Sequence, residues 1–453
     1  MMMLKVLSKC DFYYLKRDHQ CYLLHIPTMT VVNLKEDTVV DQFFVQLTGD
    51  GHFFDEEEFR SLEEEVLEVF PVFSQKFDEK GDDDSYSMQD VILPISGKCN
   101  LRCTYCFAQN KGNFGFGDIT PDNFREIIDY VMAHTNTEMQ CRFNFFGGEP
   151  MLRMDTIDAV LNYISEKYPD RNVGYGITTN GTLFTDENIE YFKNHQIDIL
   201  YSYDGPEEFT IHRVFPNGKL SNDLVAKNIQ KAKAAGLRFQ MRATIPSDCE
   251  CMWKIYDYFE NLGMPFYAVP AYKSRNVNRV CVYDERLESF KKQYEELIEY
   301  YIRRIDSGQT VYCMSIREQV ETLDKHRTHL RACSSGKYMF SIVDSGEIFS
   351  CEHLAYDKKY AIGDIHNGID MKKMKEYRPV SVHEIESCRD CWAKYLCSGG
   401  CYSEKLLIGR QHESLSPDEC EMQKMRWNFL LSVYVYLKTR QKQRQSQQKD
   451  SEK

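Results

Sequence analysis

Hydrophobic and polar positions follow a repeating pattern through residues 91–271. Short apolar runs are separated by longer stretches in which apolar residues recur every three or four positions, as on one face of a helix. The predicted strands are Val91–Ile95, Arg142–Phe146, Val173–Thr179, Ile199–Tyr203, Arg238–Ile245 and Phe266–Ala271. The predicted helices between them cover residues 121–134, 154–167, 185–194, 221–235 and 252–262.

This order of strands and helices predicts an α/β fold. Six strands separated by helices favour a parallel sheet wrapped by helices through right-handed crossovers. The pattern by itself leaves open whether the sheet is open or forms an incomplete barrel. In both cases ligands gather at the carboxyl ends of the strands, so residues at these ends are the first candidates for chemistry.

The regions on either side of this pattern differ from it. Near the N-terminus we predict strands Phe12–Leu15, Cys21–His25 and Thr30–Asn33, then helices Val39–Leu47 and Glu56–Phe70. The acidic stretch Asp78–Asp90 predicts an exposed linker. The closing stretch KTRQKQRQSQQKDSEK has almost no apolar residues and predicts a disordered tail.

Composition narrows the functional class. A chain of 453 residues suggests two or three domains. The formal net charge of −13 argues against a nucleic-acid-binding protein. Charges interrupt every hydrophobic run, so no membrane-spanning helix is predicted. The N-terminus lacks the apolar core of a secretory signal, and a cytoplasmic enzyme is therefore expected.

Cysteine is the unusual component, with 17 residues in a chain for which no export is predicted. Cytosolic thiols stay reduced, so a disulfide framework is not expected. Scattered buried cysteines are the ordinary alternative to metal ligation. Ten of the 17 fall into two groups, which favours metal. The groups are Cys99, Cys103 and Cys106, and then Cys333, Cys351, Cys388, Cys391, Cys397, Cys401 and Cys420.

The first group follows the first predicted strand, in ISGKCNLRCTYCF. Three thiolates in one short loop can hold three corners of a [4Fe–4S] cluster, which leaves the fourth iron free to bind another molecule. A structural zinc site is the alternative, although zinc loops typically use a cysteine pair rather than this triplet.

The triplet with Tyr105 before its last cysteine resembles the signature of radical S-adenosylmethionine (SAM) enzymes. This resemblance implies that the open iron chelates the methionine group of SAM, whose reductive cleavage gives a 5′-deoxyadenosyl radical. The next strand ends in FNFFGGEP. There Gly147 and Gly148 allow a ligand to approach the backbone, and Glu149 can accept hydrogen bonds from an ammonium. GGEP, which ends at Pro150, resembles the family motif for the SAM amino group, although a tight turn is the alternative.

Later strand ends supply further candidates. They resemble positions that face the SAM ribose and carboxylate in relatives, and arginine suits a carboxylate because its planar fork can pair with both oxygens. Turn chemistry and a surface salt bridge are the alternative interpretation. The candidates are Thr179, Asn180, Ser202, Asp204, Arg213 and Arg242.

The second cysteine group resembles the SPASM extension, which carries two auxiliary [4Fe–4S] clusters. Its spacing is Cys333-x₁₂-Gly346-x₄-Cys351, Cys388-x₂-Cys391-x₅-Cys397-x₃-Cys401 and then Cys420. The resemblance implies that one cluster is held by Cys388, Cys391, Cys397 and Cys420. It implies that the other is held by Cys333, Cys351 and Cys401. Its fourth ligand is left open between Cys313, Glu352, His353 and a substrate thiolate on an open iron, and Cys313 is also interpreted as a buried core residue.

SPASM proteins mostly modify peptides or proteins, and the N-terminal region narrows this further. It resembles the winged-helix leader-recognition elements of natural-product maturases, which bind a leader peptide by strand addition. An unrelated cap over the barrel is the alternative. The predicted architecture is thus a partial (β/α)6 TIM-like barrel between two smaller domains. The boundaries are a leader-recognition-like domain at 1–77, a linker at 78–90, a barrel at 91–310, a SPASM domain at 311–436 and a tail at 437–453.

These resemblances predict a maturase of a ribosomally made precursor peptide that uses SAM and three [4Fe–4S] clusters. Thioether formation from a cysteine thiol is the expected reaction, with an electron donor of flavodoxin or ferredoxin type as partner. The alternatives are carbon–carbon crosslinking, sulfatase-type oxidation of a residue to formylglycine, or a non-catalytic scaffold. In sulfatase maturases an aspartate base follows the auxiliary cysteine that corresponds to Cys351, and Glu352 stands there in this chain.

Overall fold

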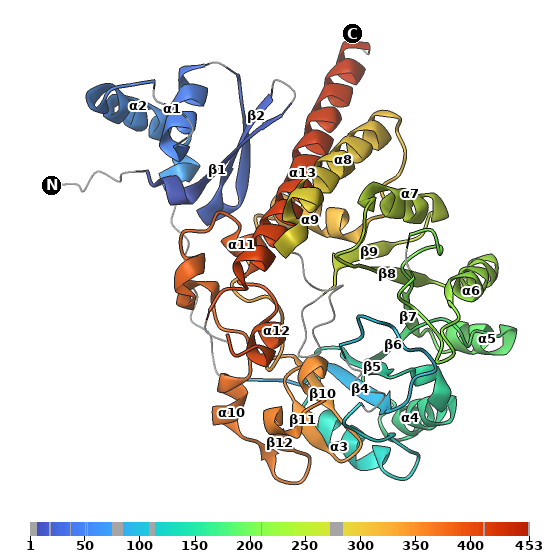
Figure 1. The fold of residues 1–453 in the computed structure, drawn as a ribbon. Helices are drawn as coiled ribbons and strands as arrows, with labels where there is room; N and C mark the ends of the chain where they lie inside the picture. The colour runs from blue at the N-terminus through green and yellow to red at the C-terminus, as the bar shows by residue number, and fades with distance from the viewer. Residues whose placement is uncertain are drawn as a thin grey trace.

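The computed structural model describes residues 7–17, 20–36, 38–49, 51, 53–74, 85–107, 114–209, 211–271, 284–410 and 413–451. Its described strands form a three-stranded sheet and a ten-stranded sheet. Figure 1 shows the small sheet beside the long C-terminal helix and away from the strands of the large sheet. In these ranges, no helix is long and apolar enough to cross a membrane.

Six parallel strands form the middle of the large sheet, and each pairs with the next one along the chain. They are β4 (Asp90–Ser96), β5 (Cys141–Gly147), β6 (Val173–Thr179), β7 (Asp198–Ser202), β8 (Phe239–Ile245) and β9 (Phe266–Pro270). The helices between them are α3 (Phe124–Ala133), α4 (Met154–Lys167), α5 (Asp186–Asn194), α6 (Asn222–Ala234) and α7 (Met252–Leu262). The predicted α/β order is confirmed. The sheet is open, because β9 lies at one end of the strand order.

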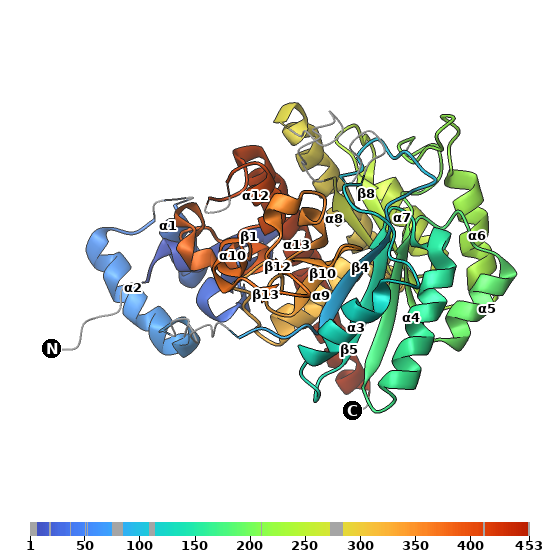
Figure 2. The same ribbon diagram turned by 90° about the horizontal axis from the view of Figure 1, so that it is seen from below.

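The two faces of this sheet are covered differently. Helices α4, α5 and α6 lie on one side, and the C-terminal region lies on the other (Figure 2). Burial on both faces explains why β4 is apolar along almost its whole length, since every residue after Asp90 is buried. Phe143 and Phe145 of β5 and Tyr201 of β7 are also fully buried in this core.

The C-terminal region adds strands to the free edge of β4. Strand β10 (Met339–Ile342) pairs with β4 in parallel, and β11 (Glu347–Phe349), β12 (Gly363–Asp364) and β13 (Gly368–Ile369) continue the sheet as antiparallel strands. This edge satisfies backbone groups of β4 that an exposed edge strand would leave unpaired. The six parallel strands and the strands of the C-terminal region therefore belong to one sheet.

The N-terminal unit contains the predicted antiparallel strands, β1 (Phe12–Arg17), β2 (Gln20–His25) and β3 (Thr30–Leu34). Helices α1 (Val39–Thr48) and α2 (Glu56–Val69) follow, and α1 packs Phe43 and Phe44 against one face of the sheet. The other face packs on the C-terminal region, where the ring of Tyr13 stacks on Trp392 at 3.8 Å. The resemblance of this N-terminal unit to a winged-helix leader-recognition element stays a prediction.

The remaining helices belong to the C-terminal half: α8 (Leu287–Asp306), α9 (Met314–Asp324), α10 (Met371–Glu376), α11 (Lys394–Cys397), α12 (Tyr402–Leu407) and α13 (Pro417–Ser451). Short 3₁₀ turns are η1 (Lys9–Asp11), η2 (Ile26–Thr28), η3 (Pro71–Ser74), η4 (Pro150–Arg153), η6 (Asp284–Arg286), η7 (Glu352–Leu354), η8 (Lys358–Tyr360), η9 (Val382–Glu384) and η10 (Glu386–Cys388).

Helix α13 corrects the prediction of a disordered tail. It packs along α8, as Figure 1 shows, with the ring of Phe429 against Tyr294 and Tyr301. The helix then continues to Ser451 through the polar stretch. Glutamine, lysine and arginine have high helix propensity, so a helix that begins by packing can extend through them. Of the predicted linker, residues 78–84 lie outside the described residues.

Candidate functional site

The loop after β4 brings Cys99, Cys103 and Cys106 to one cavity of about 410 Å³. Most of the other predicted site residues line the same cavity: Tyr105, Gly147, Gly148, Thr179, Asn180, Ser202, Arg213, Arg242 and Glu352. Glu149, Pro150 and Asp204 are buried but are not among the residues that line it. The cavity lies where the parallel strands end, as the α/β pattern predicts.

Hydrogen-bond donors surround the sulfur atoms of this loop. The Cys99 sulfur accepts bonds from Leu101 N at 3.4 Å and from Asn180 Nδ2 at 3.8 Å. Arg213 Nη1 lies 4.0 Å from the Cys103 sulfur. Burial raises the pKa of Cys99 to about 11 and that of Cys103 to about 12. Because these raised pKa values favour the protonated thiols, a thiolate in this loop needs both the N–H donors and a bound cation to be stable. This requirement fits ligation of a cluster.

The described residues contain no group of three or more His, Cys, Asp or Glu side chains placed to hold one metal ion. Each thiolate of a cubane cluster binds a different iron, so its ligands stand farther apart than the ligands of one ion.

The two glycines of GGEP make room for the cysteine loop. Gly147 has a φ of +119°, and a Cβ there would lie 2.5 Å from the carbonyl oxygen of Ser96. A Cβ on Gly148 would overlap the carbonyl oxygen of Lys98. Gly148 N also donates to Ser96 O at 2.7 Å, and Glu149 N donates to Lys98 O at 2.8 Å. The glycines thus admit the backbone of the cysteine loop, although both also line the cavity.

Glu149 joins the ends of two neighbouring strands. Its fully buried carboxylate accepts bonds from Thr179 Oγ1 at 2.7 Å, Asn180 N at 2.8 Å and Met151 N at 3.1 Å. Burial raises its pKa to about 7. The sequence predicts an acceptor for an ammonium, whereas in the structure these oxygens bind and position the β6 end of the cavity. Asn180, held in this way, also bonds Asn100 Oδ1 at 2.8 Å.

Asp204, Arg213 and Tyr105 form a buried network beneath Cys103. Asp204 Oδ2 accepts bonds from Arg213 Nε at 3.0 Å and from the Tyr105 hydroxyl, while its Oδ1 accepts Thr244 N at 2.9 Å. The Arg213 guanidinium lies 5.5 Å from the centre of the Tyr105 ring. Asp204 and Arg213 therefore form a buried ion pair rather than a surface salt bridge, and this pair holds the permanent positive charge of Arg213 beside the Cys103 sulfur.

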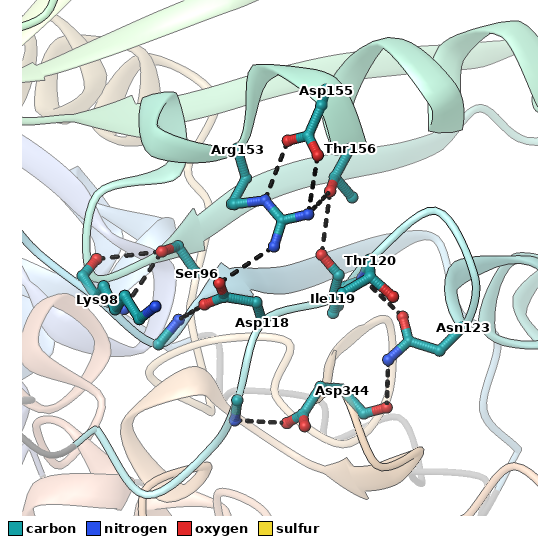
Figure 3. Close-up of polar contacts among 12 residues, drawn as sticks. Ser96, Lys98, Asp118, Ile119, Thr120, Asn123, Arg153, Asp155, Thr156 and Asp344 are labelled. Carbon is teal, nitrogen blue, oxygen red and sulfur yellow. Dashed lines mark hydrogen bonds and ion pairs between the residues drawn. The ribbon is translucent and has the colours of Figure 1, made fainter.

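Two acidic residues that sequence analysis missed hold the chain on either side of the cysteine loop (Figure 3). Asp118 accepts Gly97 N at 2.9 Å and Arg153 Nη1 at 3.1 Å. Asp344, from the turn between β10 and β11, accepts Gly117 N at 2.8 Å. The sequence offers no motif for these contacts, because Asp344 is more than 200 residues from the glycine that it binds.

The C-terminal region closes one side of the cavity with Glu352 and His353. The His353 ring stacks on Phe107 with ring centres 4.0 Å apart, next to the cysteine loop. The Cys351 thiol donates to Glu352 Oε2 at 3.3 Å. A carboxylate at the cavity wall is thus bonded to a predicted auxiliary ligand. Phe107 is a further cavity residue that sequence analysis missed.

Several cysteines of the second group have one another as neighbours in the structure, and their assignment to two clusters stays a prediction. Burial, together with the nearby Cys391, Cys388 and Cys420, raises the pKa of Cys397 to about 12. Burial raises the pKa of Cys401 to about 12, with Glu404 and Cys333 as contributing neighbours. Cys401 is in turn a neighbour that raises the pKa of Cys351.

A second cavity of about 470 Å³ is lined by Cys333, Cys397 and Cys401. Gln319 and Trp427 line it too, and their buried Nε2 and Nε1 atoms have no hydrogen-bond partner among the described residues. Unpaired buried donors beside three thiols fit a bound group with acceptor atoms, as the sulfides of a cluster would provide.

Cys313 lies in the main core and not with the other cysteines of the C-terminal region. This corrects the prediction that Cys313 is a candidate auxiliary ligand. It is fully buried in the main core, where it bridges to Phe266 of β9 and its backbone N donates to Glu260 Oε1 at 3.1 Å. It does not line the second cavity. Of the remaining scattered cysteines, Cys281 lies outside the described residues.

Comparison with known proteins finds a match to one family and similarity to several proteins. Residues 93–258 match the Radical SAM superfamily. The radical SAM cyclopropyl synthase TigE of Paramaledivibacter caminithermalis is 25% identical over 335 residues, which cover 69% of this chain and 67% of TigE. The cysteine-type anaerobic sulfatase-maturating enzyme of Clostridium novyi is 25% identical over 337 residues, which cover 70% of this chain and 89% of that enzyme.

Two solved structures share the fold. Native anSMEcpe with bound AdoMet has a TM-score of 0.63 and 19% identity, over 76% of this chain and 99% of that one. Streptococcus suis SuiB has a TM-score of 0.50 and 14% identity, over 91% of this chain and 99% of that one. At these identities the likeness concerns the fold alone.

Proposed function

From its identity as a radical SAM enzyme, we propose that this chain modifies a ribosomally made precursor peptide and joins a cysteine thiol to a carbon atom as a thioether. The observation that carries this proposal is the cavity that Cys99, Cys103 and Cys106 share with Glu352. Glu352 directly follows Cys351, a predicted ligand of the auxiliary set, so the cavity brings the family cysteines close to that set.

The cavity residues fit a SAM-binding cluster. Cys99, Cys103 and Cys106 would each hold one iron, and Arg213 and Arg242 carry fixed charges that suit the SAM carboxylate. When bound, the [4Fe–4S] cluster and SAM supply the one-electron chemistry that starts hydrogen abstraction. The chain contributes orientation through the Asp204–Arg213 pair. It also contributes shielding from water, because the stacked rings of Phe107 and His353 lie beside the cysteine loop.

Glu352 is the proposed proton acceptor. It lines the cavity, and its side chain is only 19% exposed. A carboxylate there can take the proton of a substrate thiol or of a carbon that loses an electron. By the family resemblance, Cys333, Cys351 and Cys401 would supply three thiolates to the first auxiliary cluster, and Cys333 and Cys401 of this set line the second cavity. We propose that the fourth position of this cluster is open to a substrate thiol.

Oxidation of a substrate residue, as in sulfatase maturation, is the second candidate. The position of Glu352 directly after Cys351 favours it, and a sulfatase-maturating relative matches 70% of this chain. Mass spectrometry of the product separates the two candidates after alkylation of free thiols. If a thioether has formed, the product peptide has two hydrogens fewer than the substrate peptide and one thiol fewer that can be alkylated. An unchanged thiol count would contradict the thioether, and an aldehyde at a former cysteine or serine would establish the alternative.

Replacing Glu352 by glutamine is expected to slow peptide modification about 100-fold, because a positioned general base typically contributes 10² to 10⁴. SAM cleavage and iron content should stay unchanged. Anaerobic assays of product peptide and of 5′-deoxyadenosine measure the two activities separately. Glu347→Gln is the matched control, since Glu347 lies on nearby β11 but pairs with Lys358 and is not a cavity residue. Equal rates in both variants would exclude the role of Glu352.

The N-terminal unit is proposed to bind the leader of the precursor peptide. Its sheet has two edge strands, and three residues of β3 are half-buried, which suits strand addition. Deletion of this unit would uncover the face that packs on Trp392, so we prefer a test on the peptide.

A core peptide without its leader is expected to be modified at least about tenfold more slowly than the full precursor, because a bound leader raises the local concentration of the core. The substrate is a cysteine-containing precursor peptide with its leader, and SAM cleavage in the absence of peptide is the reference. Excess isolated leader should inhibit modification of the full precursor. Equal rates with and without the leader would refute leader binding.

A further inference from the structure

Lys405 is a buried lysine whose charge has little compensation. It lies on α12, directly after the Cys388–Cys401 segment, and is only 2% exposed. Its Nζ donates to Glu413 O at 3.0 Å. Within the described part of the chain it forms no ion pair with a carboxylate, and the Glu413 carboxylate pairs with Arg410 at 3.0 Å. A buried ammonium is costly unless an anion lies nearby.

The surroundings of Lys405 contain thiols from both auxiliary sets. Its Nζ lies 3.7 Å from the position that a Cβ on Gly399 would take, in the turn between Cys397 and Cys401. Burial lowers the pKa of Lys405, and neighbouring thiolates oppose this change. They are Cys388, Cys397 and Cys420 of one set and Cys401 of the other. The ammonium therefore lies beside the Cys397–Cys401 turn, which carries one thiol of each predicted set.

We propose that Lys405 is the shared counter-charge of the two auxiliary clusters and raises the reduction potential of both. This inference rests on the auxiliary clusters of the proposed function. A cluster gains a negative charge when it is reduced, and a fixed ammonium in a buried setting stabilises that state more than the oxidised one. Lys405 is thus a positioning residue that makes the auxiliary sites better electron acceptors.

The test is a redox titration of the reconstituted full chain, followed by electron paramagnetic resonance. In Lys405→Met, the ratio of reduced to oxidised auxiliary cluster at a fixed potential should fall about tenfold, which corresponds to about 59 mV for one electron. Lys405→Arg keeps the charge and should restore most of the wild-type ratio. The cluster of the Cys99 loop serves as an internal reference and should keep its potential.

Lys424→Met is the matched control. Lys424 also lies near two cluster ligands, Cys391 and Cys420, but its side chain is 39% exposed and pairs with Glu421 at 2.8 Å. Water and salt screen such a charge, so its removal should change the ratio less than about threefold. Lys405→Gln, which can still donate to Glu413 O, provides a second neutral variant in case the methionine variant folds poorly.

The outcomes separate this inference from the proposed function. Lower auxiliary potentials in both neutral variants, with rescue by arginine, would support the counter-charge. Wild-type potentials in the neutral variants at full iron content would overturn it, and so would an arginine variant that behaves like methionine. A wild-type chain that binds iron only through the Cys99 loop would instead refute the auxiliary clusters themselves.

Discussion

Replacing Gly148 by alanine is expected to remove the cluster from the Cys99 loop. The new Cβ would overlap the Lys98 carbonyl oxygen and would lie 3.0 Å from Cys99 N. These atoms are backbone, and Lys98 O is already bonded to Glu149 N at 2.8 Å, so the loop that carries Cys99 must shift. A displacement of about 1 Å can reduce catalysis about 100-fold, and we expect at least this loss in SAM cleavage.

Iron analysis and 5′-deoxyadenosine formation measure this effect in anaerobically reconstituted protein. The iron of the Cys99 loop should be lost while iron at the auxiliary sites remains. Gly174→Ala is the control, since Gly174 lies at the start of β6, and the atoms nearest to its new Cβ would belong to the Gln140 side chain at 3.2 Å. Full iron content with wild-type SAM cleavage in Gly148→Ala would contradict the close approach of these two loops.

Replacing Asp204 by asparagine is expected to destabilise the protein by about 3–5 kcal/mol, the usual cost of leaving a buried charge without its partner. Arg213 would lose the carboxylate that its Nε contacts at 3.0 Å, and the two side chains are only 9% and 1% exposed. The Tyr105 hydroxyl would lose its acceptor at the same time. Chemical denaturation of the reconstituted protein measures the change.

Asp198→Asn, at the start of β7, is the comparison variant. Asp198 pairs with Arg142 at 2.8 Å, but its side chain is 56% exposed. Exposed ion pairs contribute about 0–1 kcal/mol, so this variant should unfold almost like the wild type. Similar stability of the two variants would mean that the Asp204–Arg213 pair is not a buried structural unit.

Local patterns predicted the elements of the barrel well. Strand β6 has the predicted limits, and β5 differs from its predicted range by one residue at each end. Such agreement is expected where strands are buried on both faces and helices have one apolar face, because these periods depend only on neighbouring residues. The same dependence on neighbouring residues explains why the prediction of a disordered tail was wrong. Helix α13 is held by distant residues such as Tyr294 and Tyr301, and a local pattern contains no information about them.

The candidate site could likewise be predicted only in part. Cysteine spacing predicted that Cys99, Cys103 and Cys106 meet at one cavity, because a short loop limits how far apart its thiols can lie. The role of Gly148 was not predictable, since nothing in GGEP reveals that the backbone of Lys98 occupies the space above it. Pairing of β10 with β4 also joins segments more than 200 residues apart through a strand of four residues. Such a short run carries no clear strand period.

The sequence by itself determined the α/β order and the three-cysteine loop, because these depend on side-chain period and loop length. Only the tertiary structure decided that Glu352 and His353 close the cavity, that Cys313 belongs to the core and that Lys405 is buried beside the Cys397–Cys401 turn. Those placements result from packing between distant segments, where the burial of a charge or a ring depends on neighbours that sequence spacing does not specify.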